Sequence, residues 1–140
     1  MDTTTILGIR GARATALIVA LAAVLSMAFA GVAYAALVDG SNRDNTLTGT
    51  ERSDVIRGHG GNDKLHGLGG TDVLNGGTGK DELYGGAGED FLRGGGGGND
   101  LLVGGEGVTD EFAGGAGYDR CDVEGPEHAG HNITGCEEVF

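Results

Sequence analysis

From residue 40 onward, one apolar side chain recurs at every ninth position, apart from two single-residue shifts. The intervening residues are mostly polar or glycine. A single apolar position of this kind predicts short β-strands that each turn one side chain inward and the flanking ones outward. The predicted inward residues are Leu47, Ile56, Leu65, Leu74, Leu83, Leu92, Leu102, Phe112 and Cys121.

The N-terminal part has a different pattern. Residues 14 to 38 carry no charge and follow Arg10 and Arg13, and small residues at Ala33-Tyr34-Ala35 offer a cleavage site, with a weaker one at Ala28-Phe29-Ala30. This order predicts a signal peptide over residues 1–35, cut after Ala35. The alternative is an uncleaved membrane anchor, since about 20 apolar residues can span a bilayer.

The middle of the chain divides into tandem units of nine residues. From Gly40 they read GSNRDNTLT, GTERSDVIR, GHGGNDKLH, GLGGTDVLN, GGTGKDELY, GGAGEDFLR, then GGGGNDLLV, GGEGVTDEFA and GGAGYDRCD, with one extra residue assigned to Gly94 and another to the unit that begins at Gly104. Position 1 is always glycine. Position 6 is aspartate in every unit but the first, which has Asn45.

Composition alone leaves two interpretations. The chain has 31 glycines and one proline among 140 residues, and 5% aromatic residues, which fits a disordered linker or a repeat fold. One proline excludes a collagen-like chain. A disordered linker gives no physical reason for an acidic and an aliphatic residue to recur at fixed positions of every nine-residue unit. We therefore expect a solenoid. The net charge of -12 argues against nucleic-acid binding and suits hard cations.

These units resemble the G-G-x-G-x-D-x-U-x repeats of RTX calcium-binding proteins over residues 40–122. The resemblance implies an all-β fold, a parallel β-roll (right-handed β-solenoid) in which two units make one coil. Six glycine-rich residues of each unit would turn and three would form a strand. Residues 36–39 would be a short lead-in, and residues 123–140 a C-terminal capping tail.

The resemblance also implies calcium ions between stacked turns, held by backbone carbonyls and by both position-6 aspartates. Calcium takes six to eight oxygen ligands, and glycine permits the tight turns that supply carbonyls. The expected carboxylates form two columns, Asp54, Asp72, Asp90 and Asp110, and Asp63, Asp81, Asp100 and Asp119. The expected carbonyls belong to Gly58, Gly60, Gly61, Gly67, Gly69, Gly70, Gly76, Gly77, Gly79, Gly85, Gly86 and Gly88.

The two insertions make the sites at Asp100 and Asp110 less well supported, and Asn45 predicts a weak or empty site beside Asp63. We therefore expect Asp63, Asp72, Asp81 and Asp90 to be the firmest ligands.

The only cysteines, Cys121 and Cys136, would form a disulfide in an oxidising compartment and fold the tail over the open end of the roll. Two free thiols are the alternative. The nearby His128 and His131 lack the further partners of a zinc site and are interpreted as surface histidines.

Three apolar residues, Val55, Val73 and Phe91, share position 7 of alternate units and would stack on one outer face. Such a stripe can be a self-association surface. The strand preference of β-branched and aromatic residues explains it as well.

These observations predict a secreted protein that binds several Ca²⁺ ions, folds on binding them and has no enzymatic activity. The chain contains no G-x-S-x-G elbow, no H-E-x-x-H motif and no phosphate-binding loop ending in Lys-Ser/Thr. The alternatives are a membrane-anchored structural or adhesive protein and a non-catalytic remnant of a secreted hydrolase or toxin.

Overall fold

The computed structural model describes residues 35–106, 109–123 and 130–140. The regular elements of these residues are twelve strands, and none of the described residues belongs to a helix that could cross a membrane. The strands are β1 (Leu37–Ser41), β2 (Thr46–Thr48), β3 (Val55–Gly60), β4 (Lys64–Gly69), β5 (Val73–Thr78), β6 (Glu82–Ala87), β7 (Phe91–Gly96), β8 (Leu101–Glu106), β9 (Glu111–Ala116), β10 (Arg120–Asp122), β11 (Asn132–Thr134) and β12 (Glu138–Val139). The predicted signal peptide falls on residues 1–35, of which all but the last lie outside the described part.

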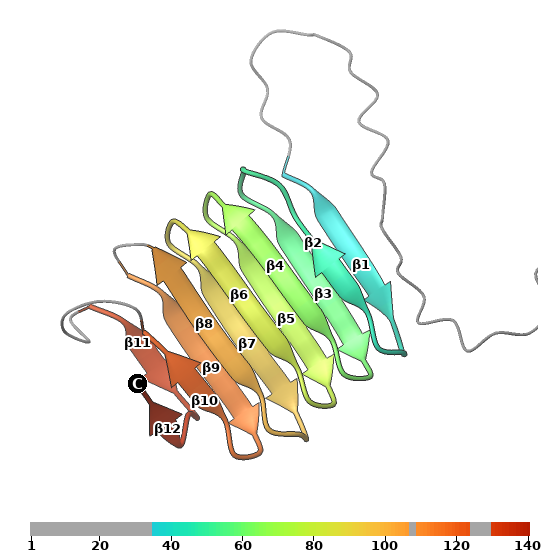
Figure 1. The fold of residues 1–140 in the computed structure, drawn as a ribbon, viewed down its shortest axis with the longest axis vertical. Coiled ribbons are helices and arrows are strands. Elements are labelled where there is room, and N and C mark those ends of the chain that lie inside the picture. The colour runs from blue at the N-terminus through green and yellow to red at the C-terminus, as the bar shows by residue number, and fades with distance from the viewer. Residues whose placement is uncertain (1–34, 107–108, 124–129) are drawn as a thin grey trace, which may run out of the picture.

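The strands form two parallel sheets that run the length of a solenoid (Figure 1). One sheet has the order β1-β3-β5-β7-β9-β11 and the other β12-β10-β8-β6-β4-β2. Each strand pairs with the strand two further along the chain, so that Val55 lies beside Val73 and Val73 beside Phe91. Two nonapeptides therefore make one coil, and the predicted all-β parallel roll is confirmed.

The strands are longer than the sequence predicted. A complete strand such as β3 covers positions 7 to 9 of one unit and continues through positions 1 to 3 of the next. From His59 onward position 2 has a positive φ, as at Gly77 (φ 111°), yet positions 2 and 3 still pair with the adjacent coil. The chain thus bends within the ladder, and only positions 4 to 6 form the turn. His59 (φ 79°) and Leu68 (φ 85°) adopt the same conformation without being glycine.

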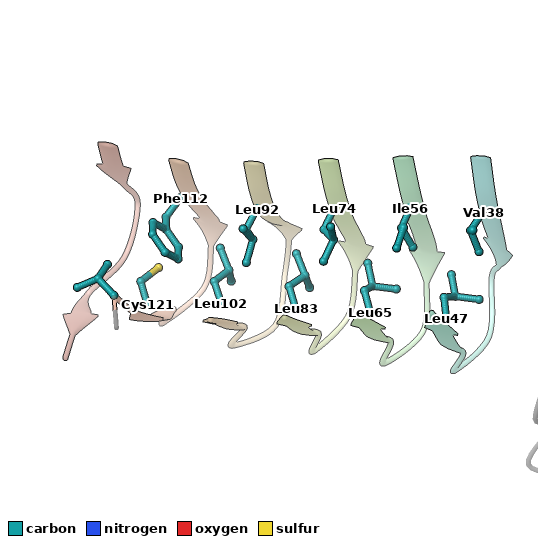
Figure 2. Close-up of a cluster of buried hydrophobic side chains, with 11 residues drawn as sticks. Val38, Leu47, Ile56, Leu65, Leu74, Leu83, Leu92, Leu102, Phe112 and Cys121 are labelled. Carbon is teal, nitrogen blue, oxygen red and sulfur yellow. The ribbon is translucent and has the colours of Figure 1, made fainter. Parts of the chain in front are cut away.

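The core is a double row of single side chains between the two sheets (Figure 2). All nine predicted inward residues are buried, with 2% or less of their surface exposed, and Val38 and Val123 extend the rows at the ends. The neighbouring positions 7 and 9 of β3 to β9 are partly or fully exposed, as expected. Each buried aliphatic side chain contributes about 1.5–3 kcal/mol, but a strand supplies only one of them.

The first insertion lies in a different place from the one predicted. Gly95 pairs with Gly77 and Gly96 with Thr78, so Gly94 occupies position 1 of its unit. The register resumes at Gly98, which faces the carbonyl of Gly79. The extra residue is therefore Gly97, at the tip of the turn. Because five glycines follow one another, the sequence alone does not show which of them is the extra residue.

The tail adds one strand to the end of each sheet. β11 pairs with β9, with Ile133 beside Phe112, and β12 pairs with β10, with Val139 beside Cys121. The predicted disulfide between Cys121 and Cys136 is confirmed. Residues 124–129, which include Pro126 and His128, lie outside the described ranges.

The apolar stripe on the first sheet is exposed and begins one strand earlier than predicted. Leu37 pairs with Val55, and 62% of Leu37, 42% of Val73 and 40% of Phe91 is exposed. Glu111 ends the stripe beside Phe91. Self-association through this face stays a prediction.

Candidate metal-binding site

The position-6 aspartates form two hydrogen-bonded columns, one along each edge of the roll. The Oδ1 atom of each aspartate accepts a hydrogen bond from the backbone N–H of the position-6 residue one coil earlier; Asp54 accepts from Ala36. These N···O distances lie between 2.7 Å, for Asp54 to Asp72, and 3.0 Å, for Asp90 to Asp110. The columns contain the predicted neighbours, including Asp100 and Asp110, because both insertions are accommodated in the turns.

The second carboxylate oxygen of most column residues lacks a hydrogen-bond partner. In the described part of the chain, the buried Oδ2 atoms without a partner belong to Asp63, Asp72, Asp81, Asp90, Asp100 and Asp119. Leaving a buried polar atom unpaired costs about 1–3 kcal/mol, and more for a charged group. The recurrence of such atoms at one position of the repeat therefore indicates a common functional cause.

Five of the six unpaired oxygens face a position-1 glycine that a backbone carbonyl also faces; they belong to Asp63, Asp72, Asp90, Asp100 and Asp119. A Cβ added to Gly58 would collide with Oδ2 of Asp63 and would lie 2.6 Å from the carbonyl oxygen of Gly76, in the next coil. The same pair of oxygens surrounds Gly67 and Gly85. Glycine is required at position 1 because carboxylate and carbonyl oxygens approach the same side of its α-carbon.

Other carbonyls of the turns also face the next coil. The carbonyl of His59 points at Gly77, and that of Gly61 points at Gly79. Of the predicted carbonyl donors, those at position 4, such as Gly61, lie in the turns that also hold the aspartates, whereas those at positions 1 to 3, such as Gly58 and Gly60, lie in the second half of a strand. Ligation by any of these carbonyls stays a prediction.

Burial makes five of the eight column carboxylates hard to ionise. The pKa of Asp72 and of Asp100 is raised to about 6, first by burial, against the lowering effect of the hydrogen bond from the preceding backbone, and then by the neighbouring carboxylates. Burial also raises the pKa of Asp63, Asp81 and Asp90. A cation beside these groups would favour their charged form.

The family model of the RTX calcium-binding nonapeptide repeat (4 copies) matches residues 39–74, 66–97 and 95–121. The chain belongs to this family. No curated protein and no solved structure matches it.

RTX repeats bind calcium in general, and the donors found here fit that ion. They are all oxygen atoms, and they combine carboxylates with carbonyls, which is the mixture that Ca²⁺ prefers. Within the described ranges, no three His, Cys, Asp or Glu side chains come together as a metal-binding group. Any ion in this RTX roll would therefore depend on carbonyls as well as on paired aspartates.

Sequence reasoning missed the residues that end the two columns. Nδ1 of His131 accepts a hydrogen bond from the N–H of Asp110 at 2.9 Å, and Oε2 of Glu137 accepts one from the N–H of Asp119 at 2.7 Å. The side chain of His131 is 8% exposed, so its interpretation as a surface histidine was wrong. The available signal was an apolar residue two positions after each one, Ile133 and Val139.

Proposed function

We propose that this RTX protein is a secreted, non-enzymatic calcium-binding protein whose roll forms when several Ca²⁺ ions bind between its coils. The observation that carries the proposal is the series of six buried, unpartnered Oδ2 atoms in two columns. Each of those described above at Gly58, Gly67 and Gly85 has a carbonyl oxygen of the next coil nearby.

Calcium supplies the positive charge that these carboxylates lack. In the proposed sites, successive aspartates of a column and the carbonyls of their turns share an ion. Six pairs are available: Asp54 with Asp72, Asp72 with Asp90, Asp90 with Asp110, Asp63 with Asp81, Asp81 with Asp100, and Asp100 with Asp119.

Folding and binding are coupled in this proposal for two reasons. The hydrophobic core contains one side chain per strand, which is little to offset the ordering of a glycine-rich chain. The carboxylates are also costly to ionise in the fold, because burial and then the charges of Asp90 and Asp54 raise the pKa of Asp72. Because the sites need stacked coils, the free energy of ion binding stabilises the folded state.

The first coil differs from the others. Oδ2 of Asp54 accepts a hydrogen bond from the hydroxyl of Thr50 at 2.9 Å, and Oδ1 of Asn45 accepts one from the hydroxyl of Ser41 at 3.3 Å. A side chain at position 2 thus satisfies part of what an ion would satisfy elsewhere. We expect the sites at this end to be the weakest.

Calcium titration of the whole protein tests the proposal. Calorimetry is expected to detect several bound ions, and circular dichroism is expected to change from a disordered spectrum in chelator to a β spectrum in millimolar Ca²⁺. The same spectrum in both conditions, with no heat of binding, would contradict it. Magnesium at equal concentration is the control, because Mg²⁺ is smaller than Ca²⁺, demands near-ideal octahedral geometry and gives up its waters reluctantly. It therefore fits a flexible set of carbonyl ligands poorly.

Secretion is the second part of the proposal and rests on the N-terminal sequence. Mass spectrometry of the protein released into the medium is expected to find Ala36 as the first residue. An intact N-terminus in the membrane fraction would instead favour the alternative of an anchored structural or adhesive protein. A catalytic reading frame beside this one would favour a remnant of a secreted hydrolase or toxin.

A further inference from the structure

The last turn of the protein rebuilds, in fewer residues, the arrangement of the turns before it. At Gly114 an added Cβ would meet Oδ2 of Asp119 and the carbonyl oxygen of Gly135. Gly58 has the same surroundings, with Oδ2 of Asp63 and the carbonyl oxygen of Gly76. Gly135 therefore occupies position 1 of a further unit, although the family match ends at residue 121.

Glu137 occupies position 6 of that unit. Its carboxylate accepts the hydrogen bond from the N–H of Asp119, as an aspartate does in every earlier coil, and its own N–H donates to the carbonyl of Asp119 at 2.9 Å. Only Cys136 separates Gly135 from Glu137, whereas four residues separate Gly58 from Asp63. The longer side chain of glutamate spans the distance, and the disulfide fastens the shortened turn to Cys121 in the core.

The carboxylate of Asp119 indicates that a ligand binds at the C-terminal end of its column. It is fully buried, its Oδ1 accepts the N–H of Asp100 at 2.9 Å, and its Oδ2 has no hydrogen-bond partner. The guanidinium of Arg120 does not neutralise this end, because it pairs with Glu138 at 2.9 Å. Glu137 is exposed, so the space beside it can be reached from solvent.

We propose that the carboxylates of Asp119 and Glu137 and the carbonyl of Gly135 form a terminal calcium site outside the nonapeptide repeats. This site rests on the proposed function, since it uses the same donor chemistry. It adds one ion to the column of Asp63, Asp81, Asp100 and Asp119.

The other column has no such site. It ends in His131, whose Nδ1 accepts the N–H of Asp110 and lies 3.7 Å from Oδ2 of that residue. An imidazole nitrogen brings no negative charge, and calcium prefers oxygen ligands. The column of Asp119 therefore ends in the proposed calcium site, and the column of Asp110 ends in a hydrogen bond to His131.

Native mass spectrometry of the whole protein in calcium tests this asymmetry. Glu137→Gln keeps an oxygen for the N–H of Asp119 and removes only the charge, so the variant is expected to bind one ion fewer than the wild type. Glu138→Gln makes the same change in charge one residue further on, and His131→Asn alters the end of the other column. Both controls are expected to keep the wild-type number.

The outcomes separate this proposal from the general one. Wild type that binds no calcium overturns both. Wild type that binds several ions, with an equal number in Glu137→Gln, overturns the terminal site alone. Loss of one ion in Glu138→Gln or His131→Asn as well would also overturn it, because the effect would then not depend on Glu137. If Glu137→Gln unfolds, Glu137→Asp is counted instead: it keeps the charge, but its side chain is too short to span the turn, so it is also expected to bind one ion fewer, and the wild-type number would overturn the terminal site.

Discussion

The carboxylate of Asp72 accepts the backbone N–H of Asp54, 18 residues earlier, at 2.7 Å through one oxygen, and its other oxygen is buried without a partner. The first contact joins two coils. The second oxygen opposes the folded state whenever the group is charged and no cation is near. The same carboxylate thus links the stacking of the coils to proton and cation binding.

The calcium-free roll is expected to be most stable in acid. The pKa of Asp72 and of Asp100 is about 6 in the folded protein, above the ordinary value of 3.8, so protonation favours folding. Stability from these groups is fully present below about pH 4 and is lost as the pH rises through about 6. Circular dichroism after chelation, recorded from pH 3.5 to 7.5, checks this: the β signal is expected to be largest in acid and to give way to the disordered spectrum near neutral pH.

Calcium is expected to reverse that trend, because protons compete with the ion for the same oxygens. Asp72→Asn is expected to flatten the pH dependence of the calcium-free β signal. A calcium-free β signal that grows as the pH rises would contradict this account.

Removing one column charge is expected to weaken calcium binding. Asp90→Asn keeps an oxygen for the N–H of Asp72 but lowers the charge where two sites meet, so calcium affinity should fall roughly tenfold or more, since contacts of charged groups are worth about 1.5–3 kcal/mol. Glu89→Gln makes the same charge change at an exposed neighbour and should leave affinity unchanged. Equal effects of both variants in calorimetry would point to net charge and not to the column.

The disulfide is expected to stabilise the calcium-bound roll by about 3 kcal/mol, the value for a loop of roughly 15 residues. Cys121 and Cys136 are 15 residues apart and hold the last coil against the one before it. Urea unfolding with and without reductant measures the difference. As a control, the double variant Cys121→Ala, Cys136→Ala should have the same urea midpoint with and without reductant. An unchanged midpoint in the reduced wild type would show that the disulfide does not stabilise the roll.

Position 2 offers a test of backbone strain. Leu68 has φ 85°, a region that costs a non-glycine residue about 1–2 kcal/mol, and Gly86 stands beside it in the next coil with φ 116°. Leu68→Gly is expected to stabilise the roll by roughly 1 kcal/mol after the entropy cost of glycine. Gly86→Leu should destabilise it, because a Cβ would meet the carbonyl of Leu68. A urea midpoint that falls in Leu68→Gly or rises in Gly86→Leu would contradict the backbone strain assigned to position 2.

Sequence reasoning predicted the core and the columns because each depends on one position of a repeat. Leu74 and Asp72 are both buried, as their phase requires. The strand lengths could not be predicted in the same way, since glycines at positions 1 to 3 suggested a turn. In the structure positions 2 and 3 pair with the adjacent coil, as Gly77 does with Gly95 and Thr78 with Gly96, while the positive φ of position 2 bends the chain.

The ends of the columns were missed for another reason. His131 lies 21 residues after Asp110, which breaks the spacing, and Glu137 keeps the 18-residue spacing from Asp119, but neither residue is an aspartate, so residue type did not connect them to the repeat. Their role became visible only through the hydrogen bonds from Asp110 and Asp119. An insertion within a run of identical residues, such as Gly94 to Gly98, likewise has no location in the sequence alone.

Gly97 has a consequence for how such a protein can change over generations. An added Cβ there would touch nothing within 4 Å, and the strands on either side keep their partners. Copying errors that lengthen a glycine run by one codon would therefore be tolerated at a turn tip, whereas the same error at position 1 or 6 would displace a whole column. Variation in repeat length among descendants of this gene is accordingly expected to collect at the turn tips.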